Sequence, residues 1–311
     1  MTEDVVNVRD LLDPELRGVF DGWPAPPIDQ CIAVGRSAPP PAVPLSDAVA
    51  RTGHTVPGDP EVRVRVHRPR GVPGPLPAVV SMHGGGYIVG SYDSCDPLFD
   101  DWCPRLGVIG IAVEYRLAPE TPYPGPLEDC YAALKWACDN AADLGIDAGR
   151  IGVHGSSAGA GLAAGLALLA RDRGEVPVAF QALDCPMLDD RQATGSINAE
   201  GLFVWTRGHN ELGWRSYLGD LYGREEVPPY AVPARAADLA GLPPTGIVVG
   251  AIDGFRDECV TYAQRLSQAS VPCDLHVIAG LPHAYRAAPE AAAVRHARRD
   301  LDDWIARQLA G

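Results

Sequence analysis

The chain has 311 residues, of which 46% are hydrophobic, enough for the core of one large α/β domain or two small domains. Its 40 acidic and 26 basic residues give a net charge of −14, which disfavours binding to nucleic acid or anionic membranes. The eight cysteines show no C-x-x-C pair or zinc-type spacing, and neither a signal peptide nor a membrane-spanning apolar run is present, so we expect a cytoplasmic protein without a metal.

The N-terminal segment, residues 1–48, is predicted to be an appendage to the main domain. A short helix is expected after Asp13-Pro14, because Asp can cap a helix and Pro fits its first turn. Further along, seven prolines remove backbone donors, so regular structure between them is not expected (Pro24, Pro26, Pro27, Pro39, Pro40, Pro41 and Pro44). Five large apolar residues favour a segment that wraps over a pocket rather than a flexible tail (Leu11, Leu12, Leu16, Phe20 and Trp23).

From about residue 49, strand and helix patterns alternate along the chain. Val62, Val64 and Val66 alternate with charged residues, which predicts an edge strand at 61–67. Unbroken apolar runs predict further strands, and apolar residues three or four positions apart predict helices. The strands are expected at 76–82, 108–113, 151–153, 178–183, 246–249 and 275–278, and the helices at 126–140, 158–171, 256–270 and 289–309. This order predicts an α/β fold with a mostly parallel sheet covered by helices on both faces.

The alternation breaks between 189 and 229, which we interpret as an insertion. It contains five aromatic residues that could pack it onto the domain or line an apolar pocket (Phe203, Trp205, Trp214, Tyr217 and Tyr222).

A candidate nucleophile lies where the apolar run 151–153 meets a helical run of small residues. Hydrolases place a serine at such a strand-to-helix turn, and crowding there excludes side chains two residues before and two residues after the serine. Gly155 and Gly159 frame Ser157 in this way, whereas His and Ala occupy the corresponding positions around Ser156. Ser157 is therefore predicted to be the nucleophile.

A serine nucleophile needs a base and an acid that orients the base. Asp253 follows the strand 246–249 and His283 follows the strand 275–278, which gives the order Ser, Asp, His of an α/β-hydrolase. Asp257 and Glu258 are rival acids, but they lie one turn into the next helix, where ion pairing or capping is expected. His276 and His296 are interpreted as structural.

The developing oxyanion needs backbone N–H donors close to the nucleophile. Ala158, directly after the serine, is expected to supply one, and Gly84 and Gly85 of a glycine loop are expected to supply the others. His83, at the end of the preceding strand, is expected to brace this loop by hydrogen bonds.

These motifs together resemble the hormone-sensitive-lipase-like carboxylesterases of bacterial family IV. The resemblance covers residues from about 50 to the C-terminus and is carried by His83-Gly84-Gly85-Gly86-Tyr87, Tyr115-Arg116-Leu117-Ala118-Pro119-Glu120, Gly155-Ser156-Ser157-Ala158-Gly159, Pro186-Met187-Leu188-Asp189, Asp253 and His283. It implies an α/β-hydrolase fold that hydrolyses small acyl esters of short to medium chain length without metal or organic cofactor. The expected domains are a cap segment at 1–48, a cap insertion at 189–229, and core parts at 49–188 and 230–311. A homodimer is possible.

The chain departs from the family pattern at two positions. Ser156 stands where the family more often has Asp, and Asp184 replaces an apolar or aromatic residue at a strand end. No function is assigned to Asp184 from sequence. Arg116 and Glu120 are expected to form an ion pair.

Three alternative interpretations remain. The pattern at 159–164, G-x-G-x-x-A with Asp184 at the next strand end, also matches a dinucleotide fingerprint, although Gly155-Ser156-Ser157-Ala158 separates the strand from its first glycine. A non-hydrolytic receptor or dehydratase could share the fold, since fold does not fix function. A lactone or amide could also be the substrate.

Overall fold

The structure, a computed structural model, describes residues 7–23, 26–38 and 43–310. In this part of the chain, one eight-stranded sheet has the strand order β1-β2-β4-β3-β5-β6-β7-β8. β2 pairs antiparallel with β1 and β4, and all other neighbours pair parallel. The predicted α/β fold with a mostly parallel sheet is therefore confirmed. The strands are β1 Val49–Val56, β2 Val62–Pro69, β3 Leu76–Met82, β4 Ile109–Glu114, β5 Ile146–Ser156, β6 Gln181–Asp184, β7 Thr245–Gly250 and β8 Cys273–Ile278.

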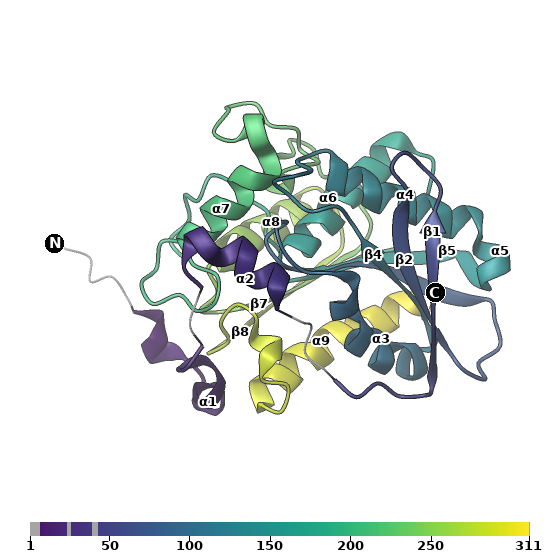
Figure 1. The fold of residues 1–311 in the computed structure, drawn as a ribbon, viewed down its shortest axis with the longest axis horizontal. Coiled ribbons are helices and arrows are strands. Elements are labelled where there is room, and N and C mark those ends of the chain that lie inside the picture. The colour runs from purple at the N-terminus through teal and green to yellow at the C-terminus, as the bar shows by residue number, and fades with distance from the viewer. Residues whose placement is uncertain (1–6, 24–25, 39–42, 311) are drawn as a thin grey trace.

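Helices cover both faces of the sheet. Helices α4, α6 and α8 lie on one face, while α3 and α9 lie on the other (Figure 1). The indole N–H of Trp102 in α3 donates to the Asp302 carboxylate in α9 at 2.8 Å, which ties these two helices together. The longer helices are α2 Cys31–Ser37, α3 Asp96–Trp102, α4 Gly125–Asp139, α6 Ala158–Arg173, α7 Arg207–Leu218, α8 Arg256–Gln268 and α9 Ala292–Leu309, and the short ones are α1 Arg17–Phe20 and α5 Ala141–Leu144. No helix within the described residues is both long and apolar enough to cross a membrane.

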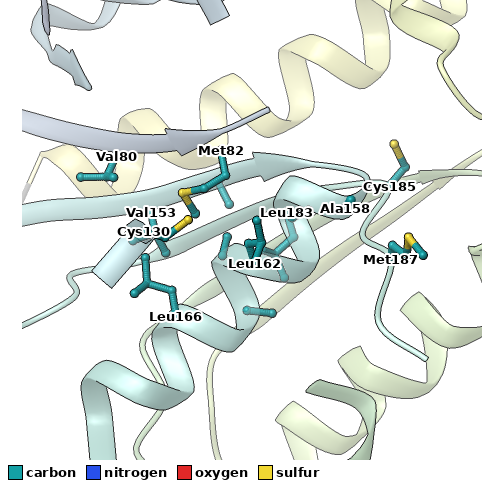
Figure 2. Close-up of a cluster of buried hydrophobic side chains, with 14 of the residues drawn as sticks. Val80, Met82, Cys130, Val153, Ala158, Leu162, Leu166, Leu183, Cys185 and Met187 are labelled. Carbon is teal, nitrogen blue, oxygen red and sulfur yellow. The ribbon is translucent and has the colours of Figure 1, made fainter. Parts of the chain in front are cut away.

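The core lies between the sheet and its helices. Every residue of β3 and of β7 is buried, as their mostly apolar sequences predict. Figure 2 shows Leu162 and Leu166 of α6 packed beneath strand residues that include Met82 and Val153. Burying one such side chain contributes about 1.5–3 kcal/mol, so this layer fixes the position of α6 and of the turn that precedes it.

Two expectations about the strands and helices are wrong. The strand 61–67 is not an edge strand, because β1 pairs along its full length, and β1 escaped prediction because only its ends are apolar. Regular structure does exist between the prolines: α2 forms in the proline-free stretch 28–38. Pro24, Pro39, Pro40 and Pro41 lie outside the described residues.

The expected ion pair between Arg116 and Glu120 is also absent from the described structure. Arg116 binds Asp129 of α4 at 2.7 Å, while Glu120 binds Arg36 of α2 at 2.8 Å. Residues 115–120 do not form a helix, so side chains four positions apart there do not face each other.

Candidate active site

Ser157 occupies a strained turn between β5, which ends at Ser156, and α6, which begins at Ala158. Its φ of 56° and ψ of −121° are unusual for a residue with a side chain and cost about 1–3 kcal/mol. A Cβ atom on Gly155 would lie 2.1 Å from the Gly159 carbonyl oxygen, and one on Gly159 would lie 2.2 Å from the Met82 carbonyl oxygen. Only glycine therefore fits on either side of the turn.

The structure brings Ser157, His283 and Asp253 together, although they come from three separate loops. Ser157 Oγ lies 3.0 Å from His283 Nε2, and His283 Nδ1 lies 2.8 Å from an Asp253 carboxylate oxygen. Because the carboxylate only accepts, Nδ1 carries the proton and Nε2 presents its lone pair to the serine hydroxyl. All three side chains are buried.

The surroundings of His283 favour its protonated form. Burial lowers the pKa of His283, but the charge of Asp253 and its hydrogen bond outweigh burial, so the pKa is raised above its usual 6.5. The second oxygen of Asp253 accepts the Phe255 N–H at 2.9 Å, and the Phe255 ring packs edge-on against the imidazole. Both groups fix the orientation of the carboxylate and the ring.

The glycine loop after β3 lies against the serine turn. A Cβ atom on Gly84 would lie 3.4 Å from Ser157 Cβ, and Gly85 has a φ of 121°, which favours glycine. Ala158 is the first residue of α6, so its N–H has no acceptor within the helix. The three candidate oxyanion donors therefore come from two segments that meet at Ser157.

His83 braces this loop. Its Nδ1 donates to the Gly84 carbonyl at 2.7 Å, its ring stacks on Tyr115, and the Tyr115 hydroxyl donates to the His83 carbonyl at 2.8 Å. Burial lowers the pKa of His83 to about 4, so it is neutral near pH 7.

A cavity of about 680 Å³ opens beside Ser157 and His283, within the usual size range of small-molecule sites. Its described lining contains no Asp, Glu, Lys or Arg. Trp23, Cys31 and Val34 contribute from the N-terminal segment, and Val204 and Trp205 from the insertion. Of seven non-glycine residues with positive φ in the described chain, four line this cavity (Ser157, Cys185, Val204 and Ala284), so backbone strain is concentrated at the site.

The rival residues have other partners. Asp257 pairs with Arg256 and accepts the Ser196 N–H. Glu258 is buried, burial raises its pKa well above the usual value, and it accepts the Leu188 N–H at 2.6 Å. His276 and His296 both face Asp300 in α9.

The glycines of the dinucleotide-like pattern serve helix packing. A Cβ atom on Gly161 would lie 2.3 Å from the Met187 carbonyl oxygen, so this glycine lets α6 approach the chain that leaves β6. Asp184, which a nucleotide site would direct at a ribose, is instead bound to Tyr285 and Arg286. This geometry disfavours the nucleotide interpretation.

One group of potential metal ligands occurs within the described residues. The ligand atoms of Cys185, Asp253 and His283 lie within 4.8 Å of one another. His283 and Asp253 are already hydrogen-bonded to each other, so these two need no metal to satisfy them.

Sequence reasoning missed the residues of α2 that form one wall of the cavity. Cys31, Val34 and Gly35 of α2 and Ala38, which follows its last residue, recur three or four positions apart, which is the spacing of one helical face. The surrounding prolines obscured this signal. Arg36, which fastens α2 to the core, was missed for the same reason.

Comparisons with known proteins agree with this geometry. A family model described as alpha/beta hydrolase fold matches residues 79–287. The chain is 37% identical over 211 residues to Esterase LipI of Mycobacterium tuberculosis, a match that covers 67% of this chain and 65% of that protein. It is 36% identical over 296 residues to Carboxylesterase NlhH of the same organism, covering 92% of each protein. Among solved structures, a Bacterial Heroin Esterase is 40% identical and superposes with a TM-score of 0.92, covering 96% of this chain and 98% of that one.

Proposed function

The chain belongs to the hormone-sensitive-lipase-like carboxylesterases of the α/β-hydrolase fold, and on that premise we propose that it hydrolyses small neutral acyl esters through an acyl-enzyme on Ser157. Carboxylic ester hydrolysis is the activity of this family. The observation that carries the finer proposal is the hydrogen-bonded series from Ser157 through His283 to Asp253 beside a cavity whose described lining has no Asp, Glu, Lys or Arg.

In the proposed reaction, Ser157 Oγ attacks the ester carbonyl carbon while His283 Nε2 accepts the hydroxyl proton. The amides of Gly84, Gly85 and Ala158 stabilise the negative carbonyl oxygen. The bond to the alcohol oxygen then breaks, and His283 delivers its proton to the leaving alcohol. Water attacks the acyl-enzyme with His283 again as base, and the carboxylic acid leaves as Ser157 regains its proton.

Residues 1–48 and 189–229 are proposed to form the cap over the site, because described parts of both line the cavity. A cavity of about 680 Å³ whose described lining has no Asp, Glu, Lys or Arg favours neutral, apolar acyl and alcohol groups, and we propose short to medium acyl chains. Lactones belong in the same substrate screen, since the same attack opens them.

The test is a panel of nitrophenyl esters of rising acyl length with the wild type, Ser157→Ala and the neighbouring Ser156→Ala. Ser157→Ala is expected to lose roughly 10³-fold or more in kcat, and a fluorophosphonate is expected to label the wild type and Ser156→Ala at Ser157. Wild-type activity in Ser157→Ala, or labelling at another residue, would contradict the proposal.

A further inference from the structure

Asp184, the last residue of β6, has its carboxylate buried in the protein beneath the proposed active site. The residue is 1% exposed, and both carboxylate oxygens are occupied. One accepts the Tyr285 hydroxyl at 2.6 Å, and the other forms an ion pair with the Arg286 guanidinium. A buried carboxylate is costly unless it is paired in this way, so its partners are strongly held.

The backbone of the same residue contacts the serine turn. The Asp184 carbonyl oxygen accepts the Ser157 N–H at 2.9 Å, and the next amide, that of Cys185, donates to the Val248 carbonyl in β7 at 2.7 Å. Asp184 therefore sits in a rigid part of the sheet and touches the nucleophile through its main chain.

Tyr285 and Arg286 follow His283 by two and three residues. The intervening Ala284 has a left-handed φ of 59°, and only a single 3₁₀ turn begins at Tyr285. Because this loop has little regular structure, side-chain anchors must fix where it places the imidazole. Tyr285 is 1% exposed and is anchored by Asp184.

We propose that Asp184 is a positioning residue that couples the two proposed catalytic loops, holding the His283 loop in register with the Ser157 turn. Its carbonyl fixes the nucleophile and its carboxylate fixes the base. This role rests on the proposed function. It explains why an acidic residue occupies the buried end of β6, where an apolar residue would be expected.

The charge of Asp184 also acts on His283. Burial lowers the pKa of His283, and the charge and hydrogen bond of Asp253 raise it. The charge of Asp184 adds a smaller increase to the pKa of His283. Tyr285, Cys185 and Cys259 have pKa values well above their usual ones because they are buried, and burial lowers the pKa of His154 to about 3, so none of these four changes charge near neutral pH. The charged or titratable groups facing Asp184, Arg286 and His283 are Tyr285, His154, Cys185, Asp253, Cys259 and Asp302.

The test compares Asp184→Asn with Asp190→Asn, a matched control. Asp190 is also buried and also paired with an arginine, Arg235 at 2.7 Å, but within the described residues its side chain has no hydrogen bond or ion pair to the His283 loop. Asp184→Asn is expected to lower kcat by roughly ten- to a hundredfold with KM changed less than about twofold, as for a misplaced base. The acid limb of kcat/KM is expected to move to lower pH, because removing the carboxylate charge lowers the pKa of His283. Asp190→Asn is expected to leave the midpoint of the acid limb of the kcat/KM profile unchanged.

Tyr285→Phe removes the hydrogen bond to Asp184 but keeps the ion pair between Asp184 and Arg286. It tests the positioning role independently if Asp184→Asn does not fold. It is expected to lower kcat without moving the acid limb, since the charge remains. An unshifted limb and unchanged kcat in folded Asp184→Asn, or an equal limb shift in Asp190→Asn, would overturn the positioning role. Fluorophosphonate labelling distinguishes failure of the proposed function from failure of the proposed coupling. If wild-type Ser157 is not labelled, the assignment of Ser157 as nucleophile is refuted. If Ser157 is labelled normally and Asp184→Asn behaves like the wild type, only the coupling by Asp184 is refuted.

Discussion

His83 and His283 differ in the group that accepts a hydrogen bond from Nδ1, and this group decides what each histidine can do. His83 donates to an uncharged carbonyl, so burial dominates and lowers its pKa to about 4. His283 donates to the Asp253 carboxylate, whose charge outweighs burial and raises the pKa. A proton taken from Ser157 is therefore stabilised on His283 and would not be stabilised on His83.

This difference predicts the pH dependence of the enzyme. As the proposed base, His283 must be neutral, so kcat/KM is expected to fall as the pH drops through a midpoint above 6.5. Asp253→Asn removes the charge that raises this pKa, so the midpoint is expected to move down while kcat falls roughly 10³- to 10⁴-fold. The measurement is a pH profile of kcat/KM for both proteins with a neutral ester. A midpoint that stays in place in the variant would mean that another group titrates.

At the scale of elements, the sequence predicted strands most accurately where the strand is completely buried. β3 and β7 are mostly apolar because both faces of each strand are covered, and their carboxyl ends led to Gly84 and to Asp253. β1 was missed because an outer strand needs few apolar residues, and α2 was missed because the surrounding prolines obscured the spacing of its apolar face. Long-range partners such as Arg36 with Glu120, or Asp184 with Arg286, depend on tertiary structure that no local pattern encodes.

Helix α2 offers a prediction of its own, because Arg36 fastens it to the glycine loop and the segment after β4. The Arg36 guanidinium donates to the Ile88 carbonyl at 2.9 Å, to the Ala118 carbonyl at 2.8 Å and to Glu120. Arg36→Ala is expected to loosen the cavity wall and raise KM roughly fivefold, about 1 kcal/mol, with kcat little changed.

Glu120→Gln is the matched control for Arg36→Ala. It removes only the exposed ion pair, which contributes little in water, and leaves both carbonyl contacts in place. KM is therefore expected to stay near the wild-type value. Equal KM changes in the two variants, or a loss of kcat in Arg36→Ala, would contradict a role for the carbonyl contacts in holding the wall.

At the scale of the whole molecule, two features act against anionic substrates. The net charge of −14 repels an approaching anion over distances that depend on salt, and the described cavity lining has no Lys or Arg side chain to replace the anion's hydration. Salt screens the repulsion by the net charge, because the Debye length falls from about 30 Å at 0.01 M salt to 3 Å at 1 M. The cost of losing the anion's hydration inside the cavity is local and persists at high salt.

The prediction compares p-nitrophenyl valerate with the mono-p-nitrophenyl ester of succinic acid, which is similar in length but carries a carboxylate. At 0.01 M salt, kcat/KM for the anionic ester is expected to be at least tenfold lower, since each tenfold factor needs only about 1.4 kcal/mol of unfavourable interaction. Raising the salt to 1 M is expected to narrow the gap without closing it. A gap that closes completely would assign the discrimination to long-range repulsion alone, and equal rates at low salt would show that the anion finds a cationic partner at the site.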